Sequence, residues 1–393
     1  MPIGVGVDAM AGMVNQVRPQ RRDDNQPYDR ALPLGDPGES VRIGALVPLA
    51  RPGWVQAGRH LLAGLEAAVR DVNDGGGISG TPLELVVRDT AADPRRAEAA
   101  VEELARLGVT ALAGEYHSVV ARAAATRADA LGLPFLCSSS VLDALTDQPT
   151  DWIARLSPPQ SRGWQVYADF LLGAGRDRIA VAAEPSVYWA SGARILREYV
   201  TQRGGSVIEL DARALAPAAL CDELAGRRAT ALLLLTGLPD PAVPIVRSVR
   251  RDRRLAELMI GAPAGQPEFA EWGTLLGGDG AGMPFLRYLP ERLTPLGARV
   301  EAALRERLTE APSFVAFEGY DTVTLLAEVL RSHGTDRSRI AAAWPRVAVD
   351  GTRGQIRFSR VPGIDVWQWA GAPIQVVDRD PAHPDRLRVL HTG

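Results

Sequence analysis

Two short loops in this sequence are rich in hydroxyl groups, and each follows an apolar run that is typical of a buried strand. The apolar runs end near residues 113 and 137, and helix-like sequence follows each loop. Ligands of open α/β sheets bind outside the carboxyl ends of the strands, so two such loops are expected to face one crevice and to hold a small polar molecule there. The polar side chains of these loops are Tyr116, His117, Ser118, Ser138, Ser139 and Ser140.

Ser118 is the candidate for binding an anionic group. A hydroxyl beside backbone N–H groups at a helix N-terminus favours negative charge, although an ordinary N-cap serine is the alternative. His117 could donate to the same anion or act as a pH-sensitive gate, whereas a single loop histidine is often incidental. The serines at 138–140 suit a head-group loop or the cap of the following helix, and both roles can coexist.

A serine of 138–140 near His117 also raises the possibility of a hydrolase. A catalytic serine needs a base that is itself oriented by a third group, and no such acid is identifiable. The sequence contains no Gly-x-Ser-x-Gly, P-loop or His-Glu-x-x-His motif. We therefore expect binding without catalysis, with no cofactor and no metal ion, and keep a serine hydrolase as the less favoured alternative.

Aromatic residues mark further positions around the expected crevice. Trp54 precedes the first helix, and Tyr188 and Trp189 follow a strand in the second half of the chain. Only 6% of the residues are aromatic, so this placement favours lids that bury apolar ligand surface over ordinary loop packing. Thr236 lies in a third strand-end loop of the same kind.

Length and composition exclude several classes of function. A chain of 393 residues predicts about two domains, and 46% hydrophobic with 23% charged residues is typical of globular proteins. A net charge of −3 gives no basic field for nucleic acid. No run approaches the roughly 20 apolar residues of a membrane span, so no direct membrane insertion is expected. Cys137 and Cys221 could form one bridge, but free thiols are expected.

The first 40 residues differ from the rest of the chain. Residues 15–40 are polar and contain proline, which predicts a disordered or loosely docked leader over 1–40. The first basic residue is Arg18, so the start of the chain does not resemble a secretory signal.

Strand-like and helix-like segments alternate from residue 41 onward. Alternation with continuous apolar strands predicts parallel sheets that are covered by helices on both faces. The pattern restarts after an apparent crossover at 153–159, and a second crossover is indicated at 281–294. Two doubly wound lobes are the economical interpretation. The last strands, predicted to form a terminal β-meander, are 355–358, 365–369 and 374–377.

Five motifs, taken in order, resemble the branched-chain amino acid binding family of type I periplasmic-binding-protein-like proteins. The resemblance extends from residue 41 to about 375. The motifs are Ile43-Gly44-Ala45-Leu46-Val47-Pro48-Leu49, the run from Gly64 through Asn73 into Gly75-Gly76-Gly77-Ile78-Ser79-Gly80, Leu83-Glu84-Leu85-Val86 with Arg88-Asp89, Gly319-Tyr320-Asp321, and Gly354-Gln355-Ile356-Arg357-Phe358.

The resemblance implies two Rossmann-like α/β lobes, joined by three crossovers, that close on a ligand by hinge bending. It implies that Ser118 meets a ligand carboxylate and that loop 138–140 holds the polar head. Asp321 is expected to be structural, as a brace near the hinge. The expected lobes are 41–160 with 290–335 for the N-terminal lobe and 161–289 with 336–393 for the C-terminal lobe.

The sequence departs from the family in the second lobe. Amino-acid binders of this family carry an acid there for the α-ammonium group, but the matching loop at 261–268 is small and apolar and includes Ala264. Glu268 is offset by about four residues. A buried ammonium without its carboxylate is costly, so an amide or a carboxylate that lacks the amine fits better, unless Glu268 turns into the site.

The functional expectation is therefore non-catalytic binding of a small polar solute that is amino-acid-like, an amide or a carboxylate. The partner would be an ABC permease in uptake, which implies an extracytoplasmic location. The alternative is a cytoplasmic amide sensor of the same fold that acts on a regulatory protein, and the lack of a recognisable signal peptide favours it.

Overall fold

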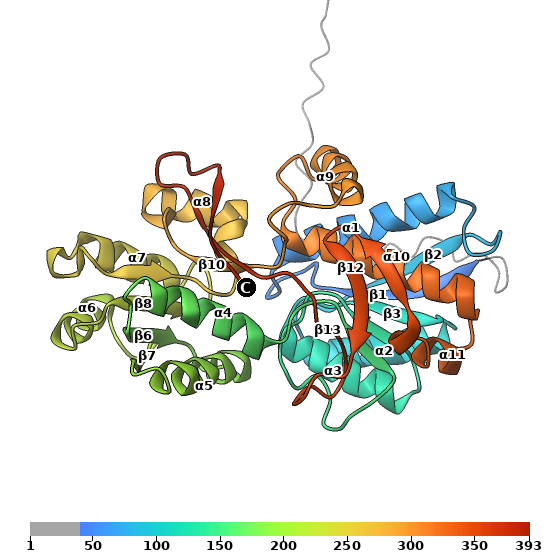
Figure 1. Cartoon of the computed structure of the whole chain (residues 1–393), viewed down its shortest axis with the longest axis horizontal. Helices are drawn as coiled ribbons and strands as arrows, with labels where there is room; N and C mark the ends of the chain where they lie inside the picture. The colour runs from blue at the N-terminus through green and yellow to red at the C-terminus, as the bar shows by residue number, and fades with distance from the viewer. Residues whose placement is uncertain (1–39) are drawn as a thin grey trace, which may run out of the picture.

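Two α/β lobes lie side by side along the long axis of the molecule (Figure 1). The computed structural model describes residues 40–393, so the leader expected over 1–40 lies outside the described residues apart from Ser40. The first lobe contains the beginning of the described chain and a late segment, and the second contains the middle of the chain and its C-terminal end. The two doubly wound lobes expected from the sequence are present.

An eight-stranded sheet forms the centre of the first lobe. Ile43 lies opposite both Leu85 and Ala111 in parallel pairings. The short strands β3 and β4 are buried along their whole length, as expected for strands covered on both faces. In spatial order the strands are β11 (Ala348–Gly351), β12 (Gly354–Ser359), β13 (Trp367–Trp369), β5 (Ile153–Arg155), β4 (Phe135–Cys137), β3 (Ala111–Gly114), β1 (Val41–Val47) and β2 (Leu83–Asp89).

Helices cover both faces of this sheet. Helices α1 and α10 pack together on one face, and α2 and α3 pack on the other. Asp93 caps α2 by accepting the N–H of Arg95, and Pro94 takes the first helical position. The helices of this lobe are α1 (Val55–Asp74), α2 (Pro94–Arg106), α3 (Ser118–Ala130), α9 (Pro295–Leu308), α10 (Phe314–His333), α11 (Arg337–Ala341) and the 3₁₀ turn η4 (Trp344–Arg346).

The second lobe contains a parallel four-stranded sheet and an antiparallel three-stranded sheet. Its helices α4 and α5 pack on one face of the parallel sheet, and α6 and α7 on the other. The strands are β7 (Ser206–Asp211), β6 (Arg178–Ala183), β8 (Ala231–Leu235) and β9 (Met259–Gly261), then β10 (Phe285–Arg287), β14 (Gln375–Arg379) and β15 (Leu387–Thr392). The helices are α4 (Gln160–Gly173), α5 (Val187–Thr201), α6 (Pro217–Gly226), α7 (Ala242–Arg251), α8 (Ala270–Leu276), η1 (Arg253–Leu255), η2 (Gln266–Glu268) and η3 (Gly277–Gly280).

One part of the expected lobe assignment is wrong. Residues 336–369 were expected in the C-terminal lobe, but β13 pairs in parallel with β5 of the first-lobe sheet, with Trp367 opposite Ala154. The predicted meander of the last strands is confirmed for its first pair, since β12 and β13 are antiparallel, and is wrong for its third strand: β14 pairs with β10 and β15 in the second lobe. Strands adjacent in sequence commonly pair, but here the chain crosses between the lobes at 370–374.

A buried ion network lies where the chain crosses between the lobes. The Arg353 guanidinium donates from Nε to Asp321 at 2.9 Å and from a terminal nitrogen to Glu318 at 3.2 Å. All three side chains are fully buried. The same guanidinium donates to the Tyr288 carbonyl at 3.4 Å and lies 5.0 Å from the Trp369 ring centre. Asp321, expected as a brace near the hinge, thus helps to fix Arg353 beside the crossovers at 288–294 and 370–374.

Glu318 links this network to the remaining crossover at 156–159. The Ser157 hydroxyl lies 2.7 Å from the Glu318 carboxylate and 2.8 Å from the Ser138 carbonyl, so it can donate to either. Burial raises the pKa of Glu318 to about 7, and the charge of Arg353 acts in the opposite direction. The network therefore contacts residues at all of the interlobe connections.

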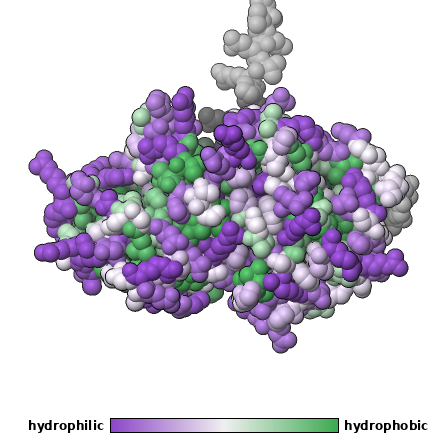
Figure 2. Space-filling view, viewed as in Figure 1, coloured by the Kyte–Doolittle hydropathy of each residue, from purple (hydrophilic) through white to green (hydrophobic). Residues whose placement is uncertain are grey.

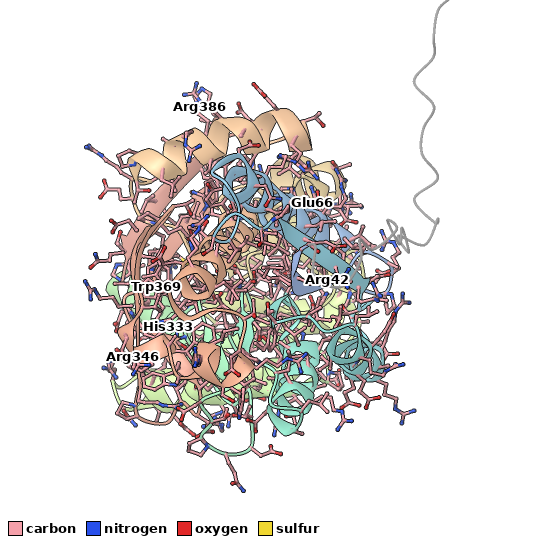
Figure 3. The ribbon with its side chains drawn as sticks, turned by 90° about the vertical axis from the view of Figure 1, so that its right-hand side faces the viewer. Arg42, Glu66, His333, Arg346, Trp369 and Arg386 are labelled. Atoms are coloured by element: carbon pink, nitrogen blue, oxygen red, sulfur yellow. The ribbon has the colours of Figure 1, made fainter. Side chains whose placement is uncertain are left out.

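Polar side chains cover most of the face shown in Figure 2, and a notch at the lower edge marks the boundary between the lobes. Seen from the side, Arg346 and Arg386 lie at the periphery (Figure 3), and both are exposed. Within residues 40–393, no helix combines the length and apolar character needed to cross a membrane. Cys137 and Cys221 are buried and free, as expected.

The close packing of α1 on α10 depends on Gly64, which yields a stability prediction. A Cβ atom at Gly64 would lie 1.9 Å from the Ala316 carbonyl oxygen, which is backbone and cannot turn away. We expect Gly64→Ala to lower the free energy of unfolding by about 1–3 kcal/mol, because the two helices must separate. Chemical denaturation measures the change. Gly173→Ala, on α4 with open space around its Cβ, is the matched control, and equal stability of the two variants would contradict the prediction.

Candidate functional site

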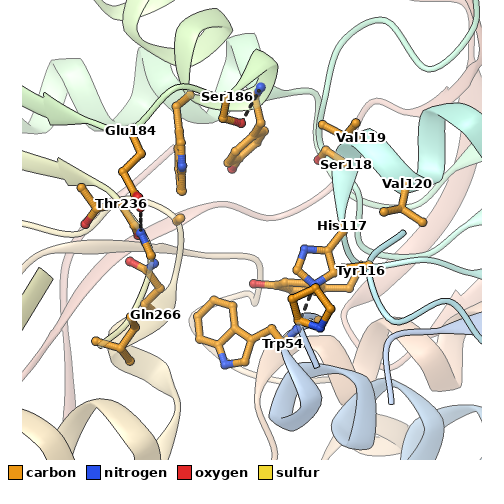
Figure 4. A pocket seen from close by; sticks show the side chains of 18 of the residues that line it. Trp54, Tyr116, His117, Ser118, Val119, Val120, Glu184, Ser186, Thr236 and Gln266 are labelled. Carbon is orange, nitrogen blue, oxygen red and sulfur yellow. Dashed lines mark hydrogen bonds between the residues drawn. The ribbon is translucent and has the colours of Figure 1, made fainter. Parts of the chain in front are cut away.

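A cavity of about 560 Å³ lies between the lobes, and residues from both lobes line it. Figure 4 shows Trp54, Tyr116, His117 and Ser118 on one side, facing Glu184, Thr236 and Gln266 on the other. Among the site residues expected from the sequence, those in the cavity wall are Trp54, Tyr116, His117, Ser118, Ser139, Tyr188, Trp189, Thr236 and Ala264. Ser138 and Ser140 are not part of the wall.

Ser118 is the first residue of α3 and lines the cavity. Its Oγ accepts the backbone N–H groups of Val141 at 3.3 Å and Leu142 at 3.4 Å. Both bonds use the oxygen as an acceptor, so the hydroxyl proton remains free to donate. The N-cap residue of α3 is His117, and its side chain makes no capping bond. Ser118 thus offers a donor at a helix N-terminus, where negative charge is favoured.

His117 is held as a neutral imidazole. Its Nε2 atom accepts the backbone N–H of Trp54 at 3.0 Å, so the ring proton resides on Nδ1, which can donate. Burial lowers the pKa of His117 to about 4. The expected donor role is compatible with this geometry, whereas a gate that titrates between pH 5 and 8 is not.

Glu115 holds this loop in place through hydrogen bonds to its backbone, a role that was not predicted from the sequence. Its carboxyl accepts the backbone N–H groups of Tyr116 at 2.8 Å and His117 at 2.9 Å, and the Thr90 hydroxyl at 2.7 Å. It is fully buried, and this burial raises its pKa to about 7. The sequence signal that could have identified Glu115 is its position directly after Gly114, the glycine that ends β3. By accepting these two N–H groups, the Glu115 carboxyl orients the loop that carries His117 and Ser118.

The serine triplet divides into different roles. The Ser138 hydroxyl accepts the Gly114 N–H at 3.1 Å and lies 2.8 Å from the Thr322 hydroxyl, so it joins β4 to α10 and does not reach the cavity. Ser140 is fully buried and absent from the wall. Their expected place in the site is therefore wrong, because both side chains are fully buried outside the cavity wall. Ser139 lines the cavity, and its hydroxyl lies beside the Glu318 carboxyl, whose pKa it lowers against the effect of burial.

Aromatic rings from both lobes surround the cavity. Trp54 meets Tyr116 edge-on at 5.8 Å and tilts against Phe269 of the second lobe at 4.8 Å. Tyr188 and Trp189 are paired at 4.7 Å in the second lobe. Burial keeps the pKa of the Tyr116 and Tyr188 phenols above the usual range, so both stay neutral donors. Two aromatic wall residues that the sequence analysis missed are Tyr288 and Phe314.

The polar wall of the second lobe was also missed by the sequence analysis, except for Thr236. Glu184, directly after β6, accepts the Arg213 Nε–H at 2.7 Å and the Gly237 backbone N–H. The Gln266 amide donates to the Thr236 carbonyl at 2.8 Å. Glu184 could have been predicted from its position at a strand end before Pro185. Gln266 could not, because most of the residues around it in the loop are small and apolar.

Glu268 does not supply the acid that the loop at 261–268 lacks. Its carboxylate accepts the Arg287 Nε–H at 2.9 Å and the Phe314 backbone N–H at 3.1 Å. Its side chain is 3% exposed and does not line the cavity. A ligand ammonium group therefore finds no acid at the position where the family pattern places one.

The site offers donors and apolar walls. Among the described cavity residues, no serine hydroxyl is hydrogen-bonded to His117, whose Nε2 is already occupied by Trp54. Within residues 40–393, no group of three or more His, Cys, Asp or Glu side chains is placed to hold a metal ion. The arrangement suits non-covalent binding of a small molecule.

A family model described as periplasmic binding protein matches residues 40–363. Leu/Ile/Val-binding protein homolog 7 of Brucella melitensis is 28% identical over 178 residues, which cover 43% of this chain and 44% of the relative. The match thus spans less than half of that relative's length.

Solved structures share the fold at low sequence identity. The leucine binding protein LivK from Thermotoga maritima has a TM-score of 0.75 at 19% identity, covering 89% of this chain and 97% of its own. A solute binding protein of an ABC transporter from Rhodopseudomonas palustris, in complex with 3,4-dihydroxy benzoic acid, has a TM-score of 0.72 at 18% identity, with 86% and 93% covered.

The depressed pKa of His117 predicts a specific pH dependence of stability. The unfolded chain takes up a proton near the ordinary His value of 6.5, and the folded chain only near 4. Stability is therefore lost as the pH falls through this window. Between pH 7 and 4.5, we expect the wild type to lose about 2 kcal/mol relative to His117→Gln.

Urea titrations of both proteins at the two pH values measure this difference. His383→Gln changes an exposed histidine and is the control, which should follow the wild type. If His117→Gln also follows the wild type at both pH values, the lowered pKa of the His117 imidazole is refuted.

Proposed function

Because this chain belongs to the periplasmic binding protein family, we propose that it binds a small solute with a carboxylate or amide head between its lobes and presents it to an ABC permease. The observation that carries this proposal is the cavity wall itself. Donors at the N-terminus of α3 face aromatic rings that come from both lobes.

The first lobe suits the polar head of the ligand. The Ser118 hydroxyl keeps its proton for donation, and the neutral His117 ring carries one on Nδ1. The positive end of the α3 dipole adds to these donors. Ser139 lines the same wall, and its hydroxyl lies beside the Glu318 carboxyl. A carboxylate or a carbonyl oxygen satisfies these groups better than a donor would.

The shared wall links binding to lobe closure. A solute held by Ser118 and Trp54 of the first lobe and by Tyr188 and Trp189 of the second contacts both bodies at once. It stabilises the closed arrangement over any open one by its differential affinity. A permease that docks on the closed form would then distinguish the loaded protein from the empty one.

The fold alone does not select the ligand. One structural neighbour is described as a leucine binding protein and another holds 3,4-dihydroxy benzoic acid, both below 20% identity. The head-group donors of this chain suit either, because both molecules carry a carboxyl group. The chemistry of the rest of the ligand depends on the residues of the opposite wall.

Calorimetry with a panel of branched-chain amino acids, aromatic carboxylates and their amides tests the proposal. We expect at least one compound to bind, and Ser118→Ala to weaken it about tenfold, since a hydrogen bond to a charged group contributes about 1.5–3 kcal/mol. Trp54→Ala should weaken binding by a similar factor through lost ring contact.

Ser332→Ala is the matched control, because Ser332 is exposed near the far end of α10 and does not line the cavity. Binding that is insensitive to both Ser118→Ala and Trp54→Ala would place the ligand elsewhere and refute the proposal.

A further inference from the structure

We propose that Glu184 and Gln266 form a second polar subsite that binds an uncharged hydrogen-bond donor at the end of the ligand opposite its carboxylate. The ligand class that follows is a ring-bearing monocarboxylate with a hydroxyl or carboxamide group at its far end. This inference rests on the proposed function and names the chemistry of the same cleft.

The Glu184 carboxylate has accepting capacity left. One oxygen accepts the Arg213 Nε–H at 2.7 Å and the other accepts the Gly237 N–H. An ionised carboxylate has about four lone-pair sites, so two of them remain. The side chain is 13% exposed and lines the cavity, and it lies on the wall that faces Trp54 and Ser118 (Figure 4).

Gln266 adds a neutral acceptor beside it. Its Nε2 atom donates to the Thr236 carbonyl at 2.8 Å, which fixes the amide and leaves Oε1 as an acceptor. Glu184 and Gln266 lie on the same wall (Figure 4). The subsite is thus composed of acceptors, whereas the first lobe presents donors at Ser118 and His117. A ligand that crosses the cleft needs an acceptor at one end and a donor at the other.

The charge balance of the wall selects an uncharged donor. Arg213 already pairs with Glu184 within the second lobe. Arg51 of the first lobe lies 3.8 Å from Glu271 of the second lobe. The charged wall residues are therefore two cations and two anions, Arg51, Arg213, Glu184 and Glu271. An ammonium group at the subsite would lie near the Arg213 guanidinium. Because this guanidinium already compensates the negative charge of Glu184, the ammonium group would gain little electrostatic stabilisation. A hydroxyl or amide N–H bonds to the same oxygens without that repulsion.

The space between the two polar ends suits a ring. Trp54 and Tyr116 present an edge-to-face pair from the first lobe, and Tyr188 with Trp189 present another pair from the second. Aromatic groups prefer offset or edge-to-face neighbours. The cavity of about 560 Å³ also lies within the range of roughly 300–1,000 Å³ that is common for drug-sized ligands.

Three benzoates with one skeleton test the subsite by calorimetry: 4-methylbenzoate without a donor, 4-(hydroxymethyl)benzoate with a neutral donor, and 4-(aminomethyl)benzoate with an ammonium group. We expect the hydroxymethyl compound to bind about tenfold more tightly than either of the others. Glu184→Gln should reduce its advantage over the methyl compound at least about threefold, because Gln keeps fewer acceptor sites.

Arg213→Ala gives a second and opposite readout at a side chain that is 70% exposed, which keeps the test valid if Glu184→Gln misfolds. Removal of the guanidinium frees the negative charge of Glu184, so the aminomethyl compound should gain about tenfold while the methyl compound is unchanged. Glu223→Gln is the matched acid control, because Glu223 pairs with Arg227 on the surface of α6 and does not line the cavity, and it should preserve the order of the three ligands.

Leucine separates the two proposals. If leucine binds more tightly than every benzoate, the inferred ligand class is overturned while solute binding in the cleft stands. If the hydroxymethyl and methyl compounds bind equally, or if no benzoate binds, the subsite is also overturned. Equal affinity of the aminomethyl compound for the wild type and Arg213→Ala would refute the charge balance.

Discussion

The buried guanidinium of Arg353 is the constraint on which the geometry of the cleft depends. It is fully buried with Glu318 and Asp321 and also contacts the Tyr288 carbonyl and the Trp369 ring. Buried ion pairs add little net stability, but the loss of one partner costs about 3–5 kcal/mol. The network therefore joins the connections between the lobes to one another, and any change in the relative position of the two cavity walls must pass through these connections.

A second buried acid organises the head-group wall. Glu115 accepts the N–H groups of Tyr116 and His117, so the loop before α3 needs no ligand to satisfy them. His117 in turn accepts the Trp54 N–H. The aromatic lid and the helix N-terminus are thus joined before any solute enters. Preorganisation of this kind reduces the entropy lost on binding, and the remaining free donor of Ser118 is left for the ligand.

The sequence was a good guide wherever function depends on local pattern. Local sequence was enough to predict the strand ends, the capped helices and the loop with His117 and Ser118, because each depends on the types of a few consecutive residues. Ser138 and Ser140 could not be separated from Ser139, since the direction of a side chain at a turn depends on packing against Thr322 and the rest of α10. The lobe of β11–β13 was missed for a related reason, because pairing with β5 joins residues more than 200 positions apart.

The opposite wall of the cleft shows why a missing residue is an incomplete argument about specificity. The loop at 261–268 lacks the family acid, which by itself predicts only what the site does not bind. Glu184 restores a carboxylate from a different strand, yet Arg213 pairs with it and removes most of its preference for a cation. The site therefore keeps the acceptor geometry of an amino-group subsite without its charge. That combination favours a neutral donor on the ligand, and it arises from two residues whose contact the linear sequence does not reveal.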